Sequence, residues 1–390
     1  MGPVMIERIG FIADVHVANH AVAGGEYKSG LNERCRHILD ALAAAVTTAN
    51  HEKLSRLVVL GDLFDSHRPT PQMVAAVGDI LGGADMPVAL LRGNHDMTTE
   101  SPGHHAMAPL RMLTGCTIVE KPYVHSAPGG ATALALVPFQ TGPAKETLAA
   151  SLKLLESHWP RSTEPKRWQV QRLLGIHYGI HDQAMRDSIP GGWVEKANDA
   201  IAAEHLVELC REHGITACFA GNWHSYRSWS FFDMGQDRDI HICQAGTIAP
   251  TGWNNPGLEN YGRLVIWDSL ARKTTTMEVP GPRFINVGSV AEIQPILEEL
   301  DSAMPLYVRR TVGPGEAVAA GEELSKVEGL AGWDVRVDKA AAVAQAQKAA
   351  ASARSAETLD SSLLAYVAEM PLDDDIQRDR IFNMAKGYLT

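Results

Sequence analysis

The 390-residue chain has few cysteines, no long apolar run and no surplus of positive charge. Its five cysteines are odd in number, widely scattered and free of any CxxC pair. This argues against a disulfide framework or a zinc–thiolate site and favours buried free thiols. No basic stretch leads into an early apolar segment, and no run approaches the roughly 18 apolar residues that span a bilayer. We therefore expect a soluble, cytoplasmic protein with no membrane association.

Acidic residues outnumber basic ones, with 46 Asp and Glu against 35 Lys and Arg. This balance argues against the broad basic face of a protein that binds nucleic acid passively. It does not exclude a nuclease, because carboxylates gathered around divalent cations are neutralised locally and the cations attract phosphate. The 16 histidines are more informative, since several stand beside Asp or Asn at the ends of apolar segments.

Short apolar segments alternate with helical patterns up to about residue 280, which predicts an α/β, or α+β layered, fold. Five of these segments have the character of strands and end at or next to polar residues: 4–17, 57–60, 88–91, 173–176 and 217–219. Open sheets place their sites at the carboxyl ends of strands. We therefore expect the polar residues at these ends to lie together.

The polar residues at these strand ends form an ordered set of motifs. In chain order they are Asp14-Val15-His16, Gly61-Asp62-Leu63-Phe64-Asp65, Gly93-Asn94-His95-Asp96, His177 and Gly221-Asn222-Trp223-His224. Oxygen ligands mixed with imidazoles suit Mn- or Mg-like ions, or Fe and Zn, in a binuclear site. Phosphodiester hydrolysis uses two cations roughly 3.5–4 Å apart, with one carboxylate between them and a general acid for the leaving group. Each motif alone is weak, and a lone histidine is more often structural, but five in this order favour a catalytic site.

This ordered set resembles the calcineurin-like metallophosphoesterase family, whose motifs are Asp-x-His, GDxxD, GNHD, a strand-borne His and GHxH. The resemblance covers about residues 5–270 and implies a β-sandwich flanked by helices. It also implies two divalent metal ions, most simply Mn²⁺ or else Mg²⁺. The implied metal ligands are Asp14, His16 and His224 for the first ion, Asp62 as the bridge, and Asn94, His177 and Asn222 for the second.

The resemblance further assigns catalytic roles and marks one departure. His95 becomes the general acid or transition-state stabiliser, and Asp65 joins it among the catalytic residues. At position 65 archaeal and eukaryotic relatives carry His, whereas the bacterial pattern has Asp. Asn222 stands where GHxH has its first His, and a neutral amide oxygen binds transition metals less strongly than an imidazole does. We therefore predict a weaker second metal site.

Finer features resemble the SbcD-type branch of DNA repair nucleases. The string GDLFDSHRPTP at residues 61–71 is similar to its second motif. This implies a 3′–5′ exonuclease and endonuclease on double-stranded DNA ends and single strands, acting with an SbcC-type ABC ATPase in recombination and repair. It also implies a homodimer through predicted helices at 71–81 and 104–113, although their apolar stripes fit core packing equally well. Two alternatives stay open: a small-molecule phosphodiesterase or phosphatase of the same fold, and a scaffold without activity.

Composition divides the chain into four predicted parts, and the resemblance implies the role of each. Residues 1–280 form the nuclease domain, 281–338 a small α/β capping domain, 339–356 an Ala-rich linker, and 357–390 helices that dock on the ATPase or pack on the body. In the capping domain a βαβαβ order is expected, with strands at 283–287, 306–312 and 333–337 and helices at 289–300 and 322–327.

Overall fold

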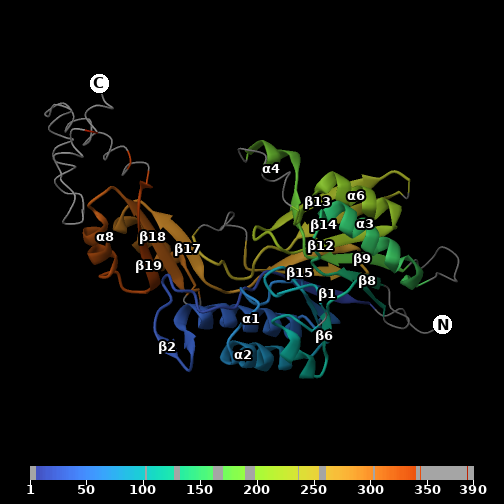
Figure 1. The fold of residues 1–390 in the computed structure, drawn as a ribbon, viewed down its shortest axis with the longest axis horizontal. Helices are drawn as coiled ribbons and strands as arrows, with labels where there is room; N and C mark the ends of the chain where they lie inside the picture. The colour runs from blue at the N-terminus through green and yellow to red at the C-terminus, as the bar shows by residue number, and fades with distance from the viewer. Residues whose placement is uncertain are drawn as a thin grey trace. The chain divides into compact units, whose positions relative to one another are not determined.

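The computed structural model describes residues 6–339, except 102, 127–131, 161–169, 189–197, 236, 254–260 and 302–303, together with residues 343 and 384. Much of the described chain forms two six-stranded β-sheets with helices beside them (Figure 1). The α/β layered fold predicted from the alternation of strands and helices is therefore confirmed.

The first sheet has the strand order β16-β15-β1-β4-β5-β6. Its strands are β1 Arg8–Ile12, β4 Arg56–Val59, β5 Val88–Leu91, β6 Cys116–Val119, β15 Arg263–Asp268 and β16 Lys273–Glu278. β1, β4, β5 and β6 run parallel, and β15 pairs antiparallel with β1. Because parallel strands end at one edge of a sheet, the segments that follow β1, β4 and β5 lie together.

The second sheet has the order β13-β14-β12-β9-β8-β7. Its strands are β7 Tyr123–Ser126, β8 Thr132–Val137, β9 Gln171–Ile176, β12 Ile215–Ala220, β13 Arg227–Asp233 and β14 Arg238–Gln244. β8, β9, β12 and β14 are parallel, so the segments after β9 and β12 also share an edge. The strands expected at 57–60, 88–91, 173–176 and 217–219 are present, while the segment 4–17 contributes only β1 and then turns.

The two sheets pack face to face through a shared apolar core. Phe11 of β1 stacks on Phe219 of β12, with ring centroids 3.9 Å apart and planes 8° apart. Leu60, Leu91, Leu136 and other fully buried residues of both sheets join this cluster. Strands buried on both faces need continuous apolar runs, which is the pattern that marks them in the sequence.

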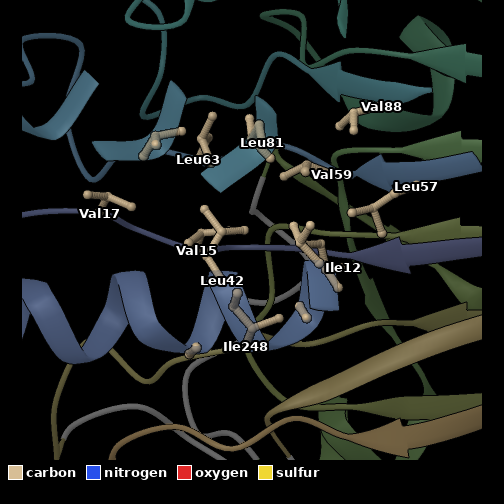
Figure 2. Packing of buried hydrophobic residues seen from close by; sticks show 14 of the residues in the cluster. Ile12, Val15, Val17, Leu42, Leu57, Val59, Leu63, Leu81, Val88 and Ile248 are labelled. Carbon is tan, nitrogen blue, oxygen red and sulfur yellow. The ribbon is translucent and has the colours of Figure 1, made fainter. Parts of the chain in front are cut away.

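Helices pack against the outer faces of the sandwich. α1 Glu33–His51 and α2 Pro71–Gly82 pack on the first sheet, and α3 Ala144–Leu155 and α6 Ala203–Glu212 pack on the second (Figure 1). The Asn32 side chain caps α1 by accepting from the Cys35 amide, and Thr70 caps α2. Figure 2 shows Leu42 of α1 beside Ile12 and Val15. This packing fixes the start of the loop that follows β1.

Smaller elements lie between the main strands and helices. They are β2 Tyr27–Lys28 with β3 Leu31–Asn32, β10 Gly179–His181 with β11 Ala200–Ala202, α4 Gln183–Ser188, and short 3₁₀ helices at Ala108–Met112, Glu156–His158 and Val290–Glu292. β9 ends at Ile176, and β10, which begins two residues after His177, belongs to a separate sheet.

The C-terminal elements are β17 Arg283–Val287, α7 Ile293–Glu299, β18 Leu306–Val312, α8 Ala317–Leu324 and β19 Leu330–Val337. The three strands form a sheet in the order β17-β18-β19, in the predicted βαβαβ order. The strands expected at 283–287 and 306–312 are confirmed. The second helix lies earlier than the predicted 322–327, and the last strand begins before 333.

Internal contacts divide the chain into two compact units. One comprises residues 1–286, 293–308 and 329–333, and the other comprises 287–292, 309–328 and 334–390. The predicted boundaries at 280 and 338 stay predictions. The linker at 339–356 and the helices at 357–390 lie outside the described residues, apart from residues 339, 343 and 384.

A compact aromatic cluster within the first unit surrounds the buried guanidinium of Arg34, and we call it the Arg34 anchor. Phe284 and Tyr307 stack with centroids 4.6 Å apart, and Trp253 meets Phe284 edge-on at 5.0 Å. Arg34 lies over the Phe284 ring, 4.8 Å from its centroid, while the Tyr307 hydroxyl is 2.8 Å from Nδ1 of His37. The anchor therefore holds the start of α1 against β17 and β18.

The helix predicted at 104–113 is wrong. The chain forms an antiparallel bridge between Met97 and His105, and only a 3₁₀ helix at Ala108–Met112 follows. The His105 ring is buried against Glu120, which keeps the backbone extended where the helix was expected to begin. α2 is present, but its Met73, Val77 and Leu81 belong to the core rather than to a free stripe. The homodimer predicted through these helices stays a prediction.

Two expectations from composition can be compared with the structure. All five cysteines are free, with four buried and Cys116 partly exposed, as the scattered thiols predicted. Among the described residues, no helix is both long enough and apolar enough to span a bilayer.

Candidate metal centre

The motif residues converge at the carboxyl edge of both sheets. Three overlapping sets of side chains place ligand atoms within 4.8 Å of one another: Asp14, His16 and His224; His16, Asp62 and His95; and Asp14, Asp62 and His177. Each comes from the segment directly after β1, β4, β5, β9 or β12. All nine site residues predicted from the sequence contact at least one other member of the group, whereas their individual roles stay predictions.

The first half of the centre is built around two facing imidazoles. Nε2 of buried His16 lies 3.0 Å from Nε2 of His224. The other nitrogen of His16, Nδ1, lies 3.2 Å from a carboxylate oxygen of Asp65. A proton on Nδ1 facing this carboxylate leaves a lone pair on Nε2. Two imidazole nitrogens at this distance, with Asp14 beside them, fit a shared cation.

The second half of the centre also uses a histidine nitrogen, but the other ligand atoms around it are oxygens. His177 is fully buried, and its Nδ1 donates to the Leu60 carbonyl at 2.6 Å. Its Nε2 is therefore the ligand atom, 2.9 Å from Oδ1 of Asn94 and 3.3 Å from Oδ2 of Asp62. An unprotonated nitrogen that faces two oxygens needs a cation or a proton between them.

Asp62 lies between the two halves. The same Oδ2 atom is 3.8 Å from Nε2 of His16 and 3.3 Å from Nε2 of His177. Its Oδ1 accepts from the His95 backbone amide at 2.9 Å, which fixes the plane of the carboxylate. Ligands bound at roughly 2.1 Å to one cation are themselves about 3 Å apart. The donor set thus fits two divalent cations that share Asp62.

The backbone at the site is strained in a way that the rest of the core is not. Asp14, His16 and Asp62 have φ values of 51°, 51° and 50°, and Asn222 has 84°. L-residues rarely adopt this left-handed region, and such strain is typical of functional sites. Gly93 is required for a related reason, because a Cβ there would lie 2.0 Å from the Asp62 carboxylate. The glycine of GNHD therefore permits close approach of two metal loops.

The buried charges at the site stabilise one another. Burial would lower the pKa of His177, but Asp62 and Asp14 outweigh it and raise this pKa to about 9. Burial opposes ionisation of Asp62 as well, yet His177 and His16 hold its pKa well below the usual 3.8. Protons and metal cations therefore compete for the same imidazole nitrogens.

His95 is placed differently from the ligands. Its side chain is 44% exposed, and Nδ1 donates to the Asp65 backbone carbonyl at 2.9 Å. Nε2 is thereby left to face solvent or a substrate. Asp65 holds both histidines, since its carboxylate faces His16 while its carbonyl faces His95. This geometry suits a general acid held beside the metal ligands.

Asn222 occupies the position of the missing histidine. Its backbone amide lies 2.9 and 3.1 Å from the two oxygens of the Asp14 carboxylate. Its side-chain Nδ2 donates to the Asp199 carbonyl at 2.9 Å and lies 3.3 Å from the Asp199 carboxylate. The departure from the family pattern is therefore built into the loop contacts and is not an isolated replacement.

Three supporting residues were missed by the sequence interpretation. Asp96 is fully buried and accepts from the amides of Gly93 and Phe64 at 3.0 and 3.1 Å, and burial raises its pKa to about 6. Thr247 donates to the carbonyl of Asp14. Asp199 supports Asn222. Asp96 could have been found, because it stands within GNHD, whereas no local pattern marks the other two.

The chain is similar to one known protein family and to several solved structures. The family model described as calcineurin-like phosphoesterase matches residues 7–226, more than half of the chain. Among solved structures, the protein TT1561 of Thermus thermophilus is 14% identical, with 70% of this chain and 99% of that chain covered and a TM-score of 0.43. A dimetal phosphatase from Danio rerio is 16% identical, with coverages of 71% and 99% and a TM-score of 0.38.

The length of the family match and the order of the motifs within it decide the assignment. The match takes in every predicted ligand from Asp14 to His224. Family members use divalent metals, and the described residues supply clusters that fit them. The chain therefore belongs to the calcineurin-like phosphoesterase family, which identifies it as a metal-dependent hydrolase of phosphoesters.

Proposed function

We propose that this protein is a DNA nuclease, with 3′–5′ exonuclease and endonuclease activity, that hydrolyses phosphodiester bonds with two Mn²⁺ or Mg²⁺ ions. The observation that carries the chemistry is the shared Asp62 carboxylate between two sets of ligands, with exposed His95 beside it. The choice of DNA rests on the SbcD-like string at residues 61–71. Exposed Arg68, at the end of this metal loop, suits a phosphate contact.

In this proposal some residues of the site bind the metal ions, and His95 transfers a proton. Bound cations supply positive charge that polarises the phosphoryl oxygens and acidifies the attacking water. Asp14, His16 and His224 would hold one ion, Asn94, His177 and Asn222 the other, and Asp62 both. His95 donates a proton from Nε2 to the leaving 3′ oxygen, because its Nδ1 is engaged by the Asp65 carbonyl.

The proposal extends to partners, location and domain roles. We propose a cytoplasmic homodimer that acts with an SbcC-type ABC ATPase through residues 357–390, and a capping role for residues 281–338. Arg309 and Arg310 are not assigned to DNA, because they form ion pairs with Asp334 and Glu323.

A substrate comparison tests the proposal. The purified chain in Mn²⁺ should degrade linear duplex DNA to mononucleotides more efficiently than it cleaves bis-p-nitrophenyl phosphate. An Asp62→Asn variant purified in parallel excludes a contaminating nuclease. Cleavage of the small diester with DNA left intact would favour the alternative, a small-molecule phosphodiesterase or phosphatase of the same fold. Metal binding without cleavage of either substrate would favour an inactive scaffold.

A further inference from the structure

We propose that Asp199 is a positioning residue that fixes the Asn222 amide and thereby makes the second half of the centre selective for hard cations such as Mg²⁺ and Mn²⁺ over Zn²⁺. This inference rests on the two-metal centre of the proposed function. It concerns a residue outside all the sequence motifs.

The contacts of Asp199 determine which way the side-chain amide of Asn222 faces. A backbone carbonyl and a carboxylate only accept hydrogen bonds, so the Asn222 atom that meets them must be the NH₂ group. The amide oxygen then lies on the opposite side of Cγ. With its backbone amide held on the Asp14 carboxylate, the Asn222 side chain has one atom that can act as a ligand, and that atom is an oxygen.

The same Asp199 carbonyl links the two ligands of this half. It accepts from the Gly179 amide at 2.9 Å as well as from the Asn222 side chain. Gly179 is two residues beyond His177 and begins β10. Asp199 therefore ties together the loop that carries Asn222 and the segment that follows His177. Supporting contacts of this kind orient metal ligands.

The donor sets of the two halves differ in hardness. The first half offers carboxylates from Asp14 and Asp62 and two imidazoles. The second offers one imidazole, His177, together with oxygens from Asp62 and Asn94. The proposal adds the side-chain oxygen of Asn222 to this set. Carboxylate and amide oxygens suit Mg²⁺ and Mn²⁺, while imidazole suits Zn²⁺. The nearby Asp199 carboxylate also polarises the amide and makes its oxygen a better ligand for a hard cation.

The test is metal binding, measured without substrate. Calorimetric titration of the full-length chain with Mn²⁺, Mg²⁺ and Zn²⁺ gives the affinity of each half, and electron paramagnetic resonance reports coupling between two bound Mn²⁺ ions. Asp199→Ala removes the carboxylate contact and keeps the backbone carbonyl, so we expect second-ion Mn²⁺ affinity to fall roughly tenfold, the lower end of the range for loss of a supporting contact. The first ion should bind as before, and the coupled signal should be lost at limiting Mn²⁺.

Two further variants separate positioning from folding. Asp199→Asn keeps an acceptor oxygen and removes the charge, so its second-ion affinity should lie between wild type and Asp199→Ala. Asp239→Ala makes the same charge change at an exposed position on β14 and should leave both affinities unchanged. If both Asp199 variants also lose the first ion or the circular dichroism of the fold, Asp199 is merely structural and the proposal is overturned.

The outcomes also distinguish this inference from the proposed function. Unchanged second-ion affinity in Asp199→Ala, or wild-type Zn²⁺ binding in the second half as tight as in the first, refutes the role of the Asp199 carboxylate while nuclease activity stands. Normal metal behaviour with no action on DNA refutes the nuclease and leaves the Asp199 inference intact.

Discussion

The metal centre and the Arg34 anchor are both clusters of buried polar groups, yet their polar atoms face different kinds of partner. In the centre, the Nε2 atoms of His16 and His177 face other ligand atoms on a strained backbone. In the anchor, Arg34 donates to the carbonyls of Val22, at 2.7 Å, and Thr251, and lies over the Phe284 ring. Carbonyls and an aromatic ring of the protein meet the guanidinium of the anchor, whereas the ligand atoms of the centre fit a cation.

This difference separates residues kept for chemistry from residues kept for stability. A strained backbone and closely facing ligand atoms persist at a site only when the surrounding structure holds them in place. A self-satisfied cluster has no such need and stabilises the fold directly. Substitutions in the centre should therefore abolish activity and metal-dependent stabilisation, and substitutions in the anchor should lower the free energy of unfolding.

The largest effect is expected for Asp62→Asn, which removes the shared ligand. Losing a charge interaction worth about 4 kcal/mol in the transition state lowers the rate by about 10³-fold. Wild-type protein should gain melting temperature when Mn²⁺ is added, because a ligand that binds only the folded state stabilises it. The variant should show no such gain in differential scanning calorimetry. A normal Mn²⁺-induced shift would contradict the assignment of Asp62 as the bridge.

His95→Ala should remove catalysis and leave metal binding intact. Loss of a general acid lowers the rate by roughly 10²–10⁴-fold. Because the hydrogen bond from His95 to Asp62 comes from the backbone amide, which the substitution keeps, metal content measured by mass spectrometry should stay at the wild-type level. His104→Ala, at an exposed position nearby, is the matched control and should retain activity. Loss of metal from the His95 variant would make this residue a ligand instead.

The anchor is tested by Arg34→Met, which should destabilise the fold without touching the metal centre. The substitution leaves the carbonyls of Val22 and Thr251 without a donor and removes the cation–π contact, a combined cost of about 3 kcal/mol. Urea unfolding measures this loss. Arg211→Met, at an exposed site on α6, should change stability by less than about 0.5 kcal/mol. Equal effects of the two substitutions would show that the anchor carries no special stability.

The sequence predicted the centre better than the anchor for a physical reason. Ligands follow apolar strands, and parallel strands end at one edge, so the motifs alone indicate that Asp14, Asp62 and His177 meet. Arg34, Phe284 and Tyr307 are brought together only by tertiary packing, and no periodicity connects residues so far apart. Asp199 was missed for the same reason.

Errors in predicted elements have a similar origin. Residues 104–113 have apolar side chains at helical spacing, but burial of His105 against Glu120 and its bridge to Met97 override that local preference. The first strand was predicted to be too long, because apolar Val15 and Val17 alternate with Asp14 and His16, although the backbone already turns at Asp14. Strain at a metal loop is a tertiary property that apolar patterning does not reveal.

A smaller effect, on metal affinity, is expected at Asn222, where the centre departs from the family pattern. Asn222→His should raise Mn²⁺ affinity of the second half by about tenfold, or 1.4 kcal/mol, since imidazole replaces a neutral amide oxygen. Histidine tolerates the left-handed backbone at this position, where φ is 84°. Calorimetric titration should show two unequal sites in the wild type and more nearly equal ones in the variant. His224→Ala should instead remove the first ion. Equal, tight wild-type sites would show that the asparagine is no handicap.

The smallest effect concerns the pH dependence of the anchor through His37. Burial lowers the pKa of His37 from its usual 6.5, with Glu33 and Asp40 opposing and Arg36 assisting. The unfolded chain therefore binds a proton more readily than the folded one. The stabilising contribution of the neutral ring is complete above pH 6.5 and is lost as the pH falls below that value.

His37→Gln keeps a partner for the Tyr307 hydroxyl but cannot titrate. Unfolding free energies of wild type and variant, compared between roughly pH 8 and pH 5, should converge on the acid side by less than about 1 kcal/mol, since the ring is partly exposed and solvent screens its charge. A difference that stays constant or widens on acidification would mean that protonated His37 is accommodated in the fold, and that the anchor, like the metal centre, holds a charge that it does not fully satisfy.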